Sequence, residues 1–257
     1  GIDTLTGGDG SDTYYVRDVG DLVSETNATA STGGTDTVYS TLSSYTLGTN
    51  IENGRLLSTS AANLTGNSLN NLLYAGVGNN VLDGSTGIDT VSYAYGVTGT
   101  TGVTVSLALT TAQATGGSGS DTLIAIENLT GSNNNDTLTG NSLANVLTGG
   151  LGKDLLIGGA GSDLFDFNAW SEIGLTSATR DVINDFAPGV DKIDLSTLDA
   201  NEGFAGNQAF SAPVVGGTFS GAFANAGDLY FDNVAHVLYG NTDADAAAEF
   251  AIQLVGV

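Results

Sequence analysis

Large apolar residues recur every nine positions in the centre of the chain and predict a series of short strands. Between residues 131 and 167, four consecutive nine-residue units each carry an Asp or Asn at the sixth position and a Leu or Phe at the eighth. The eighth-position residues are Leu138, Leu147, Leu156 and Phe165. The second half of each unit is a short aliphatic run that suits one small strand. We therefore expect an all-β parallel β-roll (β-solenoid), with these side chains forming its narrow core.

The polar half of each unit has the composition of a cation-binding turn. The unit reads GGxGxDxUx, where U is a large apolar residue, and this nonapeptide is typical of calcium-binding β-rolls. Glycines adopt positive φ at low cost and leave carbonyl oxygens accessible, and Asp adds a hard anionic oxygen of the kind that calcium binds at roughly 2.3–2.6 Å. Units two apart should stack at about 4.8 Å, a gap that two calcium–oxygen bonds span. We expect Asp136 to share ions with Asp154, and Asn145 with Asp163.

The same register recurs outside the central block. The expected calcium ligands are the sixth-position side chains and the Gly-rich turns: Asp3, Asp12, Asp21, Asp36, Asp89, Asp121, Asp136, Asn145, Asp154 and Asp163, with Gly117, Gly119, Gly150, Gly152, Gly159 and Gly161. Asn71 and Asn80 also occupy sixth positions, but a neutral oxygen should bind an ion weakly or not at all. A solvated acidic turn is the alternative for an isolated Asp-Gly sequence, and the nine-residue phasing argues against it in the central block.

Breaks in the repeat divide the chain into four expected segments. Residues 1–92 form a partly irregular β-roll, residues 93–115 an inserted hairpin or loop, residues 116–167 the regular calcium roll, and residues 168–257 a C-terminal cap of short strands and one helical turn. Solenoids need such caps to close an exposed end. The first residue falls at the fourth position of a nonapeptide, so the chain is expected to continue an upstream part of the same polypeptide.

The net charge of the chain indicates that the predicted β-roll needs bound cations in order to fold. There are 28 acidic and 5 basic residues among 257, a formal net charge of -23, and these charges repel one another on compaction. So acidic a surface argues against a nucleic-acid partner. No apolar run approaches the length of a membrane span, and no N-terminal signal peptide is recognisable. With no Cys, disulfides cannot stabilise the fold, and calcium is expected to do so.

These motifs resemble the repeats-in-toxin (RTX) family of secreted bacterial proteins. Residues 180–201, 207–210 and 248–257 resemble the end domain of serralysin-type proteases, which some lipases and alginate epimerases share. The segments DTYYVRDVGDLVSE and NLTGNSLNNLLYAG resemble the long repeat arrays of large RTX proteins with adhesive or surface roles. The resemblance implies that several calcium ions are held by the repeat Asp side chains and by carbonyl groups of the Gly-rich halves.

The resemblance also implies export by a type I secretion system to the cell exterior or cell surface. In that family the secretion signal is uncleaved and lies at the extreme C-terminus, often as an acidic residue followed by apolar ones. Glu249, Phe250, Ala251 and Ile252 fit this pattern, with Glu in place of the commoner Asp. The implied partners are the type I secretion machinery and the upstream polypeptide, with self-association or cell-surface attachment as further options.

Two acidic groups near the C-terminus are weaker metal candidates. They are Asp185 and Asp194, near Asp181 and Asp191, and Asp243 and Asp245, near Asn241 and Glu249. The first group either caps the last roll turn with an ion or lies on the surface. The second has the spacing of a calcium loop, but Ala246 stands where Gly is expected, which favours a solvated turn.

Catalytic residues are not recognisable in the sequence. The serralysin zinc motif HExxHxxGxxH and the GxSxG motif are absent, there is no Cys, and the single histidine, His236, lies in a strand-like alternation typical of a structural residue. We therefore expect a non-catalytic module. Its parent is either an extracellular structural or adhesive protein, favoured by the diverged N-terminal repeats, or a secreted enzyme, favoured by the serralysin-like cap.

Overall fold

The computed structural model describes residues 1–27 and 33–257, which form two compact units, Gly1–Ser132 and Asn133–Val257. Across the described residues the secondary structure is short β-strands and one 3-10 turn, η1 (Trp170–Glu172). Within the same residues no helix has the length and apolar character needed to cross a membrane. The all-β prediction is confirmed, and each unit is described separately below.

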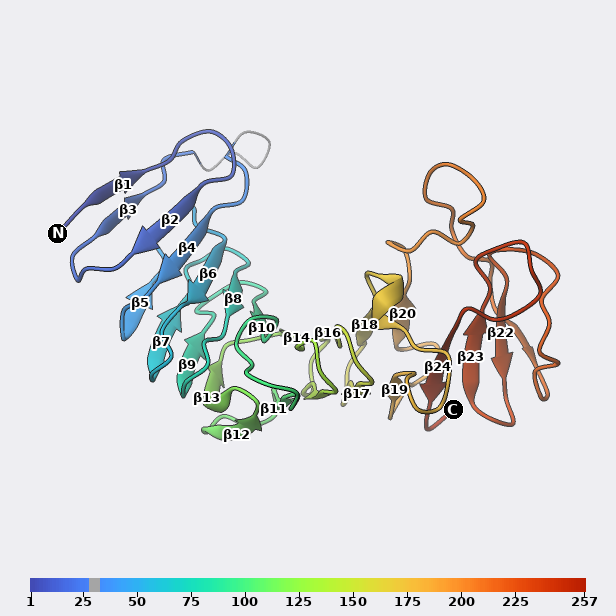
Figure 1. Cartoon of the computed structure of the whole chain (residues 1–257). Coiled ribbons are helices and arrows are strands. Elements are labelled where there is room, and N and C mark those ends of the chain that lie inside the picture. Colours follow the sequence, from blue (N-terminus) through green and yellow to red (C-terminus); the bar gives the residue numbers. More distant parts are fainter. Residues whose placement is uncertain (28–32) are drawn as a thin grey trace. The chain divides into compact units, whose positions relative to one another are not determined.

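The first unit is built from parallel strands that pair with every second strand along the chain (Figure 1). One sheet has the order β2 (Thr13–Val16), β4 (Thr37–Ser40), β6 (Asn53–Leu56), β8 (Leu72–Tyr74), β10 (Thr90–Ser92) and β14 (Asn128–Thr130). A second contains β5 (Ser44–Thr46), β7 (Ala62–Thr65), β9 (Asn80–Asp83) and β13 (Gly119–Ile124), and a third pairs β1 (Thr4–Thr6) with β3 (Leu22–Ser24). Because alternate strands enter different sheets, each coil supplies one strand to each face, as a β-roll requires.

The register confirms that units two apart stack. Leu72 pairs with Thr90, which lies two nonapeptides further along the chain. Coils nearer the N-terminus vary in length: the step from Thr13 to its partner Thr37 is longer than two nonapeptides, and the step from Thr37 to Asn53 is shorter. The strands β2, β4 and β6 nevertheless pair in parallel along their lengths, so the ladder of strands is continuous through these coils.

An insertion interrupts the first unit. It contains β11 (Thr104–Ser106) and β12 (Gln113–Gly116), and β12 pairs antiparallel with β13. Val81 consequently pairs with Thr122 on the far side of the insertion, a step much longer than two nonapeptides. The nonapeptide at residues 116–124 therefore differs from the expected stacked turn: Gly117 and Gly119 lie at the tip of an antiparallel hairpin, because the insertion supplies a strand that pairs with β13.

The second unit continues the roll and then closes it with antiparallel strands. One sheet contains β16 (Val146–Thr148), β18 (Leu164–Asp166) and β20 (Lys192–Asp194). The other has the order β15 (Thr137–Thr139), β17 (Leu155–Ile157), β19 (Val182–Ile183), β24 (Phe250–Leu254), β23 (Val237–Gly240), β22 (Leu229–Asp232) and β21 (Val214–Gly216). The C-terminal strand β24 pairs parallel with β19 and antiparallel with β23, so the end of the chain covers the last roll strand.

The core of the roll consists of the predicted eighth-position residues. In the three-residue strands β15 to β18 only the central side chain is buried. Leu138, Leu147, Leu156 and Phe165 are each 0% exposed. One buried side chain per strand leaves little apolar area per coil, and the fold therefore depends on what its turns contribute.

Candidate metal-binding site

The sixth-position residues of stacked turns contact each other directly. Oδ1 of Asp154 accepts a hydrogen bond from the backbone N–H of Asp136 at 2.7 Å, and Oδ1 of Asp163 accepts one from the N–H of Asn145 at 2.9 Å. All four residues are buried. The structure thus brings together both pairs that were expected to share ions.

This arrangement continues beyond the last nonapeptide through Asp181 and Asp191, two members of the acidic cluster that was expected either to cap the last roll turn with an ion or to lie on the surface. Oδ1 of Asp181 accepts the N–H of Asp154 at 2.7 Å, and Oδ1 of Asp191 accepts the N–H of Asp163 at 3.0 Å. Asp181 follows Asp154 by 27 residues and Asp191 follows Asp163 by 28, so a spacing of two nonapeptides no longer identifies them. The sequence signal for these two residues was the aspartate cluster after residue 180, which does not distinguish a cap on the roll from a surface location.

The first unit repeats the arrangement with both Asp and Glu. In each of six pairs, a carboxylate oxygen of the first residue accepts the backbone N–H of the second. The pairs are Asp21 and Asp3 (3.0 Å), Asp36 and Asp12 (2.7 Å), Glu52 and Asp36 (2.8 Å), Asp89 and Asn71 (2.6 Å), Asp121 and Asn80 (2.8 Å), and Glu127 and Asp89 (2.7 Å). We call these carboxylates, with those of Asp154, Asp163, Asp181 and Asp191, the carboxylate ladder. Glu52 and Glu127 were not predicted, because neither belongs to a nonapeptide.

The second oxygen of several ladder carboxylates has no hydrogen-bond donor. Among the described residues, Oδ2 of Asp89, Asp121, Asp154, Asp163 and Asp181 is buried without a partner. Burying an unpaired carboxylate oxygen is costly, and proteins compensate for it with a proton or a cation. These carboxylate oxygens are therefore suitable ligands for a hard cation.

Burial has a large effect on the protonation of these groups. Desolvation raises the pKa of Asp154 to about 8, with the Asp181 and Asp136 carboxylates adding to the rise. It raises the pKa of Asp181 to about 7 and that of Asp121 to about 6. Without a cation, the fold therefore favours the protonated form of acids that are ionised in the unfolded chain at neutral pH.

Glycines of the turns leave the space that the carboxylates occupy. A Cβ at Gly149 would overlap Oδ2 of Asp154, and a Cβ at Gly158 would overlap Oδ2 of Asp163. The predicted turn glycines adopt positive φ, with values of 91° and 128° at Gly150 and Gly152 and 93° and 133° at Gly159 and Gly161. The turn thus wraps around the carboxylate, and calcium, which takes carboxylate and carbonyl oxygens together, matches this donor set.

Asparagine at the sixth position satisfies its own hydrogen bonds. Nδ2 of Asn71 donates to the carbonyls of Ile51 at 2.9 Å and Glu52 at 3.1 Å, and Nδ2 of Asn80 donates to the carbonyl of Ala62 at 3.1 Å. The amide group thus takes up carbonyl oxygens that an ion would otherwise use. This supports the interpretation of these two turns as weak sites.

The weaker candidates in the second unit are arranged differently. Both oxygens of Asp185 accept backbone N–H groups, from Gly158 and Gly159 at 2.8 Å each. Oδ1 of Asp194 accepts the N–H of Ser196 at 2.8 Å, and hydrogen bonds from Ser196 hold the pKa of Asp194 below its ordinary value. These two carboxylates are stabilised by the protein itself and have less need of an ion.

The acidic turn after β23 brings its candidate residues together. Ligand oxygens of Asp243, Asp245 and Glu249 lie within 4.8 Å of one another. Each also accepts a backbone N–H: Asp243 from Asp245 at 2.8 Å, Asp245 from Ala247 at 2.7 Å, and Glu249 from Thr242 at 2.7 Å. The group remains a weaker candidate because these bonds also account for a solvated acidic turn.

Two protein-family models match the chain, one in its repeats and one in its C-terminal part. The model of the RTX calcium-binding nonapeptide repeat matches residues 1–22 and 61–91, and the model of the peptidase M10 serralysin C terminal matches residues 86–257. The chain belongs to the serralysin C-terminal family. Its RTX repeats bind several calcium ions, and proteins with these domains are secreted to the extracellular space. No curated protein matches the chain significantly.

The matched regions are a repeat array and a C-terminal domain, and neither match is to a catalytic domain. His236 lies in the turn before β23, with a positive φ of 55°, rather than within the strand that its apolar neighbours suggested. The side chain of Asp232 bends this turn by accepting the N–H groups of Val234 at 2.9 Å and Ala235 at 2.7 Å. The histidine thus belongs to a tight hairpin connection.

Proposed function

We propose that this chain is a non-catalytic module whose β-roll folds on calcium after the polypeptide has left the cell by type I secretion. The observation that carries the proposal is the set of buried ladder oxygens that lack a donor within the described part of the chain. Without a cation, each must hold a proton or bear the cost of burial. Calcium removes that cost, and its binding free energy becomes folding free energy.

The ions would be held between stacked turns. The side chains of Asp136, Asp154 and Asp163 would supply carboxylate oxygens, and the turns of Gly150 and Gly159 would supply backbone oxygens. Calcium is scarce inside bacteria and near millimolar outside, and extracellular modules bind it at about 10⁻⁴–10⁻³ M. An unfolded chain therefore suits the export channel, and a folded one suits the exterior.

The location of the proposed secretion signal supports export before folding. Phe250, Ala251 and Ile252 belong to β24, between β19 and β23, and are at most 1% exposed. A receptor that reads these side chains needs the chain before β24 has paired. Folding in the cytoplasm would hide the signal, and low internal calcium prevents that.

Circular dichroism tests the calcium dependence. The chain is recorded in chelator, then with calcium, then with the same concentration of magnesium. We expect a cooperative gain of β signal with calcium and a poor response to magnesium, whose strict octahedral geometry suits carbonyl-rich turns badly. A full β signal in chelator would show that calcium occupies this fold without driving it.

For the parent protein we favour an extracellular structural or adhesive role. The coils between residues 1 and 92 support it, since they vary in length and form a long stack beyond the regular calcium turns. The serralysin match over residues 86–257 favours the alternative, an export and folding module of a secreted enzyme such as a protease, lipase or alginate epimerase. Mass spectrometry of the secreted polypeptide that contains this chain decides between them, because an enzyme parent must carry a catalytic domain.

A further inference from the structure

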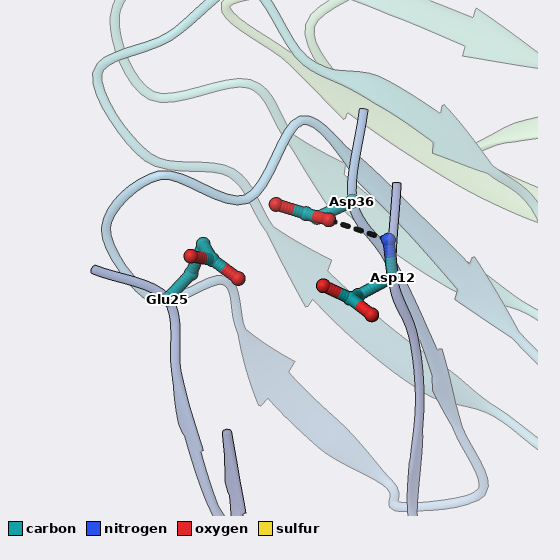
Figure 2. A group of neighbouring side chains, drawn as sticks. All are labelled: Asp12, Glu25 and Asp36. Atoms are coloured by element: carbon teal, nitrogen blue, oxygen red, sulfur yellow. Dashed lines mark hydrogen bonds between the residues drawn. The ribbon is translucent and has the colours of Figure 1, made fainter. Parts of the chain in front are cut away.

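Three carboxylates converge in the first unit, where the roll is irregular (Figure 2). Asp12 precedes β2, Glu25 follows β3 and Asp36 precedes β4. One ligand oxygen from each lies within 4.8 Å of the others. Asp36 is 1% exposed and Glu25 is 5% exposed. Glu25 is hydrogen-bonded at both oxygens, by the N–H groups of Gly8, Thr26 and Asn27 and by the hydroxyl of Tyr14. The charge that most lacks compensation in this largely water-excluded group is therefore that of Asp36.

The protein holds these groups in place by hydrogen bonds, and those to the Asp36 carboxylate engage Oδ1 alone among the described residues. Oε2 of Glu25 accepts the hydroxyl of Tyr14 at 2.8 Å and the N–H of Gly8 at 3.1 Å, and Oδ1 of Asp36 accepts the N–H of Asp12 at 2.7 Å. Among the described residues, no donor bonds to Oδ2 of Asp36. Figure 2 shows this free oxygen of Asp36 directed to the side on which Glu25 lies.

A glycine beside the group makes room for these side chains. A Cβ at Gly7 would overlap the hydroxyl of Tyr14 and would meet Oδ2 of Asp12 and Oε2 of Glu25 at 2.5 Å each. No cationic side chain supplies the missing charge, since within the described residues the one ion pair joins the amino terminus of Gly1 to Asp18. Oxygens on opposite sides of a calcium ion lie about 4.6–5.2 Å apart, and a limit of 4.8 Å falls within that span.

We infer that Asp12, Glu25 and Asp36 form a three-carboxylate calcium site that differs in composition from the nonapeptide turns. Glu25 lies outside any nonapeptide and enters the site because the coil from β2 to β4 is longer than two nonapeptides. The inference rests on the proposed calcium-dependent folding. A higher ligand charge gives tighter calcium binding, so this site should fill at lower calcium than the regular turns and order the N-terminal coils first.

Terbium luminescence tests the site, because terbium replaces calcium at oxygen sites and is excited through a nearby tyrosine. Tyr14 bonds to Glu25 and is positioned to sensitise an ion there. In the full chain we expect terbium emission at low terbium concentration, and added calcium should abolish it by displacing the terbium ion. Glu25→Gln should weaken terbium binding at this site roughly tenfold or more. Glu202→Gln, the same change at an exposed residue, should leave it unaltered.

Tyr14→Phe provides a second test that keeps all three carboxylates, and it decides the matter if Glu25→Gln does not fold. This variant should lose the low-terbium emission while retaining the calcium stoichiometry of the parent. Unchanged emission in Tyr14→Phe, or an unchanged terbium midpoint in folded Glu25→Gln, overturns the inference. Circular dichroism separates this result from failure of the proposed function. If the parent gains β structure with calcium but all variants show the same terbium emission and midpoint, this site alone is refuted.

Discussion

Asp154→Asn should stabilise the calcium-free fold and weaken its response to calcium. Burial raises the pKa of Asp154 from 3.8 to about 8, so at pH 7 the unfolded chain has released a proton that the folded chain retains. Taking up that proton on folding costs about 4 kcal/mol. An uncharged Asn avoids the cost, and Asn71 and Asn80 show that an amide at this position finds backbone carbonyl partners. We expect a gain of about 2–4 kcal/mol in chelator.

The measurement is the free energy of unfolding in urea at pH 7, in chelator and at saturating calcium, together with calcium stoichiometry. If the parent chain is already unfolded in chelator, no urea midpoint can be measured there. The folded fractions of parent and variant, measured by circular dichroism, are then compared instead. At saturating calcium the sign should reverse, because the variant binds at least one ion fewer. Asp166→Asn, the same change on the half-buried β18, should do neither. A variant no more stable than the parent in chelator, or one with equal stoichiometry, would refute the reasoning.

Three further outcomes are expected. In chelator, stability should fall as pH rises from about 4 to about 8 and then level off, because the folded pKa values of Asp181 and Asp154 (about 7 and 8) lie above the unfolded value of 3.8, and urea unfolding at pH 5 and pH 8 should show this. Gly149→Ala should cost roughly 1–3 kcal/mol in the calcium form, since its Cβ overlaps Oδ2 of Asp154, and should lower the urea midpoint. Leu156→Ala should cost about 2–5 kcal/mol in the same assay, because a fully buried side chain leaves a cavity.

The sequence predicts those parts of the molecule that depend on the nine-residue period. Leu147 and Phe165 lie in the core as expected, because strand periodicity and repeat length together determine which residue of each unit faces inward. For Asp181 and Asp191 the sequence left a cap on the last roll turn and a surface location both open, because the spacing lengthens to 27 and 28 once the nonapeptides end. Only the three-dimensional stacking identifies their position. Glu25 was missed for the same reason.

The placement of β24 could not be predicted either. Its sequence, Phe-Ala-Ile-Gln-Leu, suits any strand buried on both faces, and the selection of β19 and β23 as neighbours depends on contacts with one nearby and one distant segment of the chain. Local propensity carries no information about such pairings. The hairpin at residues 116–124 has the same origin: a motif that matches the repeat adopts another turn because the inserted β12 lies beside it.

The distribution of Asp and Asn along the ladder makes calcium dependence a local property of each coil. A coil with Asn71 or Asn80 at its sixth position satisfies backbone carbonyls through the side-chain amide, and we expect it to need an ion less than a coil with Asp there. A coil with Asp154 or Asp163 leaves a buried oxygen that only a cation or a proton can satisfy. Because each coil buries its strand only against adjacent coils, a single unsatisfied Asp position limits the stability of its Asn-bearing neighbours. We therefore expect calcium to control folding of the array even if the Asn-bearing turns bind none, and exchanging Asp for Asn at successive positions should lower the calcium requirement step by step.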